Sequence, residues 1–166
     1  MKKIIATVAL LYVICPLKLV FSQNSTLDII KQFEDTEKQL RHLSINLHKI
    51  TDSSSNWVRT NFNLLAANSI GSSSDIMSHA TDLIVLSHTV KEKQKLVIYF
   101  YIKSRLLTLK KRIEFEINDI QSKYYAGMEN RATINLIDKA KEKMKASLSL
   151  FDRSIEMLNI NKLKAP

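Results

Sequence analysis

Hydrophobic residues recur through most of this chain at alternating steps of three and four, the spacing that places side chains on one face of an α-helix. Beyond residue 24, the first such series comprises Ile29, Phe33, Leu40, Leu43, Leu47 and Ile50. Ser25 and Thr26 precede it, and the side chain of either residue can cap the free amides at a helix start. The pattern therefore predicts a first helix that begins at residue 25 or 26.

The segment TDSSSN at residues 51–56 interrupts this series. Its side chains hydrogen-bond readily to nearby backbone groups, so these residues favour helix ends over helix interiors. We therefore predict a break near residues 51–55 and a second helix over about 55–68. The helical register continues to Leu64, so one uninterrupted helix over 25–68 is the alternative.

Residues 68–74 read NSIGSSS, and a glycine within a run of small polar residues predicts a loop. Neither glycine nor proline occurs between Asp75 and Tyr124. We therefore predict one long helix over 75–124, which would extend on the order of 75 Å. Its apolar face comprises Ile76, Ala80, Leu83, Leu86, Val90, Val97, Leu106, Leu109, Ile113, Ile117, Ile120 and Tyr124.

Gly127 marks the exit from this helix, and the clearest amphipathic pattern of the chain follows it. The pattern predicts a last helix over about 129–160. Its apolar face comprises Ile137, Ala140, Met144, Leu148, Phe151, Ile155 and Leu158.

One stretch breaks the amphipathic pattern: residues 95–103 read KLVIYFYIK and lack a polar face between the two lysines. The stretch lies near the middle of the predicted 75–124 helix, and a helix that is apolar on every side is usually buried on every side. We therefore predict that it forms the central core. A partner interface and a membrane contact are the two alternatives.

Composition agrees with helices throughout, because the 166 residues include only two glycines and two prolines. Turn-rich β folds need more such residues. The predicted fold class is all-α: an elongated antiparallel bundle of three long helices, or four if the first breaks near residues 51–55. No linker divides residues 23–166, which we expect to form a single domain.

The first 22 residues have the layout of a signal peptide. Lys2 and Lys3 precede an apolar run that is too short for a typical membrane span, and Pro16 marks the predicted end of its helix. Cleavage is expected near Ser22–Gln23, which would make the protein secreted or periplasmic. Retention of residues 1–22 as a membrane anchor is the alternative.

Cleavage would remove the only cysteine, Cys15, so the remaining domain would have no disulfide and would depend on packing. It would also remove three of the 25 basic residues, and 22 basic against 16 acidic residues leave a net charge of +6. This charge is modest and spread along the chain, which argues against nucleic-acid binding.

Residues with catalytic potential are scarce. The serines lack a glycine elbow, and no glycine-rich phosphate loop is present, so an enzyme, a cofactor and a small-molecule substrate are not expected. Asp75, His79 and Asp82 share a helical face with metal-ligand chemistry. Because this face flanks the apolar stripe, we interpret these side chains as solvated and predict no metal site.

The sequence therefore favours a non-enzymatic exported protein that acts through protein–protein contacts as an adaptor, chaperone or effector, with an unknown partner or by self-association. A membrane-active or lipid-binding protein is the alternative, because the apolar 96–102 segment adjoins the basic stretch 103–112. The candidate interaction patch comprises Tyr99, Tyr101, Lys103, Arg105, Lys110, Lys111 and Arg112.

Overall fold

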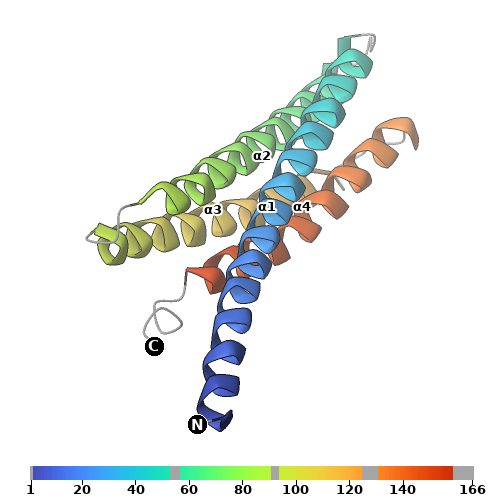
Figure 1. Cartoon of the computed structure of the whole chain (residues 1–166). Coiled ribbons are helices and arrows are strands. Elements are labelled where there is room, and N and C mark those ends of the chain that lie inside the picture. Colours follow the sequence, from blue (N-terminus) through green and yellow to red (C-terminus); the bar gives the residue numbers. More distant parts are fainter. Residues whose placement is uncertain (1, 53–56, 91–93, 125–130, 159–166) are drawn as a thin grey trace.

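Four α-helices make up the computed structural model of this chain (Figure 1). They are α1 (Lys2–Asp52), α2 (Trp57–Thr89), α3 (Lys95–Tyr124) and α4 (Arg131–Met157). The structure describes residues 2–52, 57–90, 94–124 and 131–158, and the side chains within them except those of residues 2–24, 52, 57–59 and 121–124. These described residues contain no strand, so the all-α prediction is confirmed.

Neighbouring helices run antiparallel, as the contacts between α1 and α2 show. The Ser44 hydroxyl of α1 donates to the Ala67 carbonyl of α2 at 2.8 Å, and the Ser74 hydroxyl of α2 donates to the Glu37 carbonyl of α1 at 3.1 Å. Residue numbers therefore rise along α1 as they fall along α2. Because α2 also packs against α3, and α4 against both α3 and α1, the chain forms a ring of four helices.

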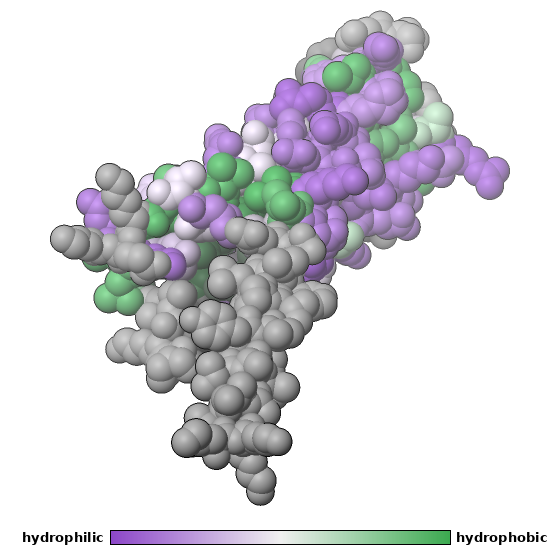
Figure 2. Space-filling model, in the orientation of Figure 1, coloured by the Kyte–Doolittle hydropathy of each residue, from purple (hydrophilic) through white to green (hydrophobic). Residues whose placement is uncertain are grey.

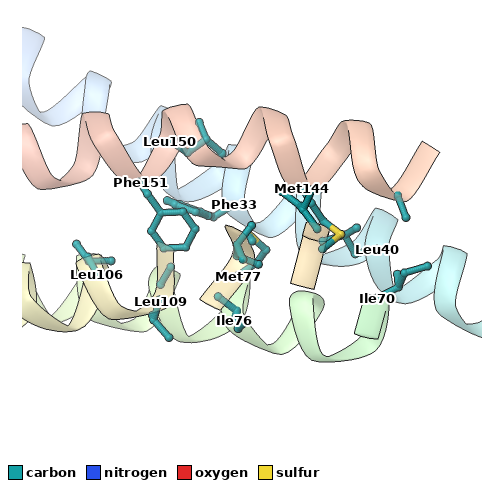
Figure 3. Packing of buried hydrophobic residues seen from close by; sticks show 14 of the residues in the cluster. Phe33, Leu40, Ile70, Ile76, Met77, Leu106, Leu109, Met144, Leu150 and Phe151 are labelled. Atoms are coloured by element: carbon teal, nitrogen blue, oxygen red, sulfur yellow. The ribbon is translucent and has the colours of Figure 1, made fainter. Parts of the chain in front are cut away.

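The core lies between the four helices, and each of them contributes to it (Figure 3). Phe33 of α1 and Phe151 of α4 pack edge to face with ring centroids 5.0 Å apart, a favourable geometry for aromatic rings. The largest fully buried side chains are Phe33, Phe151, Ile29, Leu40, Leu47, Ile70, Ile76, Met77, Ile84, Ile102, Leu106 and Ile113.

The predicted break near residues 51–55 is confirmed, because α1 ends at Asp52 and α2 begins at Trp57. The buried Thr51 hydroxyl donates to the Leu47 carbonyl at 2.7 Å, within the last turn of α1. The bundle therefore has four helices rather than three.

The predicted helix end at Pro16 and helix start at residue 25 or 26 are both wrong, because α1 runs from Lys2 to Asp52. A proline inside a helix removes one backbone hydrogen bond at a cost of about 3 kcal/mol or more, and α1 continues through that weak point. Thr26 does not cap a helix start. It is buried within α1, where its hydroxyl lies 3.7 Å from the Met157 sulfur.

The predicted loop at residues 68–74 is also wrong, because α2 passes through it. The small side chains allow α1 and α2 to approach closely, and a Cβ atom on Gly71 would lie only 3.3 Å from Ser44 Oγ. The Ser73 hydroxyl donates to the Ser69 carbonyl at 2.9 Å. The NSIGSSS segment is therefore a helix–helix contact rather than a turn.

The single helix predicted over 75–124 is wrong as well, because α2 ends at Thr89 and α3 begins at Lys95. An unbroken helix would carry residues 95–124 away from the rest of α2 and leave much of their apolar face in water. Folding back places α3 beside α2, where Leu106 and Ile113 are fully buried. Burial of apolar surface is the largest favourable contribution to folding.

The last helix is confirmed, with bounds of Arg131–Met157 against the predicted 129–160. Gly127, the predicted helix exit, lies outside the described residues. The members of the predicted apolar face that are buried are Ile137, Ala140, Met144, Phe151 and Leu158, and Leu148 and Ile155 pack partly buried against the core.

Candidate binding surface

The start of α3 extends beyond the described part of α4. Lys110 Nζ lies 2.7 Å from Asp152 Oδ1, so these two residues are level with each other in the antiparallel pair. Counting back along α3 and forward along α4 brings Ser104 level with Leu158, the last described residue after α4. The α3 residues before Ser104 therefore have no described α4 residue opposite them.

Four large apolar side chains near the start of α3 are exposed to solvent. The exposed fractions are 58% for Leu96, 74% for Val97, 70% for Phe100 and 54% for Tyr101. We call these four residues the α3 apolar tip. By contrast, Ile102 is fully buried. The prediction that residues 95–103 form the central core is therefore wrong for one helical face, and only the opposite face packs inward.

The inward face of this segment explains why the tip is held in place. Ile98 and Tyr99 are half-buried and pack against the core cluster, next to the buried Ile102. Lys95 places its Nζ atom 5.9 Å from the centroid of the Tyr99 ring, within the range of a cation–π contact. The first turns of α3 are therefore anchored on one side and open on the other.

The end of α2 adds to the exposed apolar surface. Val85 and Leu86 are both exposed, and they lie within the last turns of α2, which pair with the first turns of α3. In Figure 1 the two helices converge there, away from the N-terminal part of α1. Figure 2 shows hydrophobic residues among hydrophilic ones on this arm of the bundle.

The seven residues of the predicted interaction patch do not form one surface. Tyr101, Arg105 and Arg112 follow each other on the exposed face of α3, and Lys111 is also exposed. Lys103 is half-buried. The other members of the patch face neighbouring helices: Tyr99 packs against the core, and Lys110 pairs with Asp152 of α4.

Arg112 is exposed and also touches α2, where its Nη2 atom donates to Ser72 Oγ at 3.2 Å. The basic residues therefore continue from the α3 apolar tip along the outer face of the helix. The sequence prediction found this basic stretch and Tyr101. It missed Leu96, Val97 and Phe100, which it assigned to the core.

The acidic and imidazole groups considered as metal ligands are all exposed on α2. Asp75 Oδ1 lies 3.6 Å from Arg41 Nη2, so this carboxylate interacts with a cation on α1. His79 and Asp82 follow it along the same outer face. Within the described part of the chain, no three His, Cys, Asp or Glu side chains are grouped closely enough to hold a metal ion.

Buried polar groups join helices beneath the surface. The Ser69 hydroxyl of α2 donates to the Glu116 carboxylate of α3, and both residues are buried. Asn63 of α2 is fully buried, and its side-chain amide has no hydrogen-bond partner among the described residues. These groups lie between packed helices, so they do not form an accessible reaction site.

A shallow cavity of about 240 Å³ lies between α1 and α4. It is lined by Ser25, Ile29, Arg153, Glu156 and Met157. Beside it, the Gln32 amide donates to Asp28 Oδ2 at 2.6 Å, and Arg153 Nη2 donates to the same oxygen at 3.2 Å. The Gln32 hydrogen bond, and then that of Arg153, hold the pKa of Asp28 below its ordinary value of 3.8.

No helix among the residues with described side chains is long and apolar enough to cross a bilayer. Comparisons of this chain with protein-family models, with curated proteins and with solved structures give no match. The function is therefore argued from the residues themselves.

Proposed function

We propose that this chain is an exported, non-enzymatic helical protein that acts by binding, and that the α3 apolar tip is its binding surface. The exposure of Leu96, Val97, Phe100 and Tyr101 beside each other on one helix carries this proposal. Exposed apolar surface is unfavourable in water by roughly 25 cal/mol per Å². A cluster of this kind on a soluble domain is typical of an interaction site.

Export is supported by the layout of residues 1–22, with two lysines followed by an apolar run. We expect the protein outside the cytoplasm to begin at Gln23. Intact-mass measurement of the extracytoplasmic protein tests this directly. A mass equal to that of all 166 residues, recovered from the membrane fraction, would instead support the retained anchor.

A binding role also fits the chemistry of the described residues better than catalysis does. The buried polar groups join helices, and Asp75 lies beside Arg41 on the outer surface. Both partner classes expected from the sequence, a protein and a membrane, would use the same tip. Self-association is the third use of such a surface.

Photocrosslinking from the tip tests the binding role. A benzophenone amino acid in place of Phe100 should form crosslinked species in the cells that make the protein. Phe115 provides a matched control position, because it is also a phenylalanine of α3 and is 64% exposed. The control should give only background crosslinking. Equal yields from the two positions would contradict the assignment of the tip.

A further inference from the structure

We infer that the partner of the α3 apolar tip is an anionic lipid surface, which the tip enters while the basic residues of α3 contact the headgroups. This inference rests on the proposal that the tip is the binding surface of the protein. Three observations favour an anionic membrane over a second copy of the chain or a protein groove: local charge, the size of the tip, and its shape.

Charge around the tip is strongly one-sided. Between Leu83 and Ile113 the sequence has eight basic residues and a single acid, Glu92, and the exposed acids Asp82 and Glu114 lie directly outside this range. Arg105 and Lys111 of this set are exposed on α3, within a few turns of the tip. Each basic residue near an anionic membrane adds to the attraction between the protein and the lipid headgroups.

The same charge disfavours pairing of two copies through their tips. Two α3 helices placed side by side in the same direction would bring Arg105 and Lys111 of both copies together, and like charges at an interface repel. The apolar area is also small for a stable dimer. A standard interface uses about 20–30 residues from each partner, whereas the tip offers four large apolar side chains.

The tip projects from the bundle, so its shape suits insertion into a membrane better than binding of a partner in a groove. Its side chains project from the first turns of a helix at one end of the bundle, and the cavity lined by Ser25 and Arg153 lies elsewhere, between α1 and α4. Phe100 and Tyr101 are the kinds of side chain that favour the membrane interface. Lysine side chains can place their apolar stems beside them and keep the charge in water.

A fluorescent probe at the tip tests this inference at the residue concerned. Phe100→Cys is labelled with nitrobenzoxadiazole in a Cys15→Ser background, and Phe115→Cys is labelled in the same way as the matched control. The probe at position 100 should gain fluorescence with phosphatidylcholine vesicles that contain phosphatidylglycerol, and not with phosphatidylcholine alone. The probe at position 115, one turn beyond Lys111, should gain much less fluorescence than the probe at position 100. The readout is local, so residues 1–22 do not determine it.

Charge reversal provides the second arm of the test. Arg105→Glu with Lys111→Glu should weaken binding to the anionic vesicles by about tenfold or more. Lys139→Glu with Lys143→Glu changes the net charge equally on exposed positions of α4, and should have a much smaller effect.

Several outcomes would overturn the inference. A probe at position 100 that stays in water with both vesicle types excludes insertion of the tip. Equal binding to neutral and anionic vesicles, or equal effects of the two charge-reversed pairs, excludes the proposed recognition of negative charge. If the benzophenone at position 100 captures a protein while vesicles do not bind, the tip remains the binding surface and only the lipid partner is wrong. If neither the benzophenone nor the vesicle experiment gives a signal, the proposed function also fails.

Discussion

Serine and glycine serve the packing of this bundle at the residue scale. Ser44 of α1 reaches the Ala67 carbonyl of α2, and Gly71 lies so close to α1 that an added Cβ atom would meet the Ser44 hydroxyl at 3.3 Å. The two residues therefore share one contact. A substitution at either position should change the effect of a substitution at the other.

We predict a measurable coupling between Gly71→Ala and Ser44→Ala. Alanine improves helix propensity over glycine by about 1 kcal/mol, but at Gly71 its methyl group meets the Ser44 hydroxyl. Removal of that hydroxyl should make Gly71→Ala more favourable by about 1 kcal/mol in the free energy of unfolding, as measured by urea titration of the four variants. Additive effects, within about 0.3–0.5 kcal/mol, would contradict this close contact.

Asp28 gives a prediction about pH. Its pKa is lowered in the folded protein by hydrogen bonds from Gln32 and Arg153, so the stabilisation is present above the ordinary value of 3.8 and is lost as pH falls through the lowered value. At neutral pH, Asp28→Asn should have a lower urea midpoint than the wild type. The two midpoints should become equal at a pH low enough to protonate the wild-type carboxyl. Asp35→Asn, an exposed acid on the same helix, serves as the control.

A difference between wild type and Asp28→Asn that persisted unchanged to the lowest pH would show that charge is not responsible. The Asp28 carboxylate is exposed to solvent, so we expect a small effect that salt reduces.

Helices α1 and α4 show how far periodicity predicts an element. Phe33 and Leu40 of α1, and Ile137 and Met144 of α4, are buried as their spacing predicts. In both helices one face is apolar and the other is charged, so a single rule decides burial.

The rule fails in α2, because many of its buried residues are small and polar. Ser69, Ser73 and Ser74 are buried, and their hydroxyls hydrogen-bond to carbonyls of their own or a neighbouring helix or to a carboxylate. In sequence these residues are typical of a loop. Only the partner helices show that they form a contact. The end of α2 near Thr89 was missed for the opposite reason, because neither glycine nor proline marks it.

The helical state of residues 68–74 can be measured directly. In amide hydrogen exchange, this segment should be as strongly protected as the residues that follow it in α2, since each amide is bonded within the helix. Rapid exchange confined to residues 68–74 would contradict a helix there and would support the loop that the sequence pattern predicts.

Two substitutions in α3 distinguish an exposed tip from a core. Phe100→Gln should change the free energy of unfolding by no more than about 0.5 kcal/mol, because the side chain is 70% exposed. Ile102→Ala, two residues further along, should destabilise the protein by about 2–5 kcal/mol, because it empties a fully buried site. Similar losses for both in urea unfolding would mean that residues 95–103 are core after all.

At the scale of the whole molecule, one end of the bundle presents large apolar side chains to solvent. The tip continues the outer face of α3, on which Arg105, Lys111 and Phe115 are also exposed. No local sequence pattern contains that information, because a segment that is apolar on every side does not show which of its faces the partner helices cover. The apolar composition of KLVIYFYIK was therefore visible in the sequence, but its exposure was not.

The bundle that results has an apolar tip at one end and basic residues on the adjoining face of α3. This combination suits reversible attachment to a negatively charged surface, since apolar insertion and charge attraction each contribute a modest part of the affinity. Raising the salt concentration should weaken attachment through the charge contribution.

The most direct measurement is the binding of Phe100→Gln and Phe115→Gln to vesicles that contain phosphatidylglycerol. The two changes are chemically identical, lie on the same helix and remove similarly exposed side chains. We predict that Phe100→Gln weakens binding by about tenfold, the loss of one inserted aromatic side chain, whereas Phe115→Gln binds as the wild type does. Equal binding by both variants would contradict the assignment of the α3 apolar tip as the membrane-binding surface.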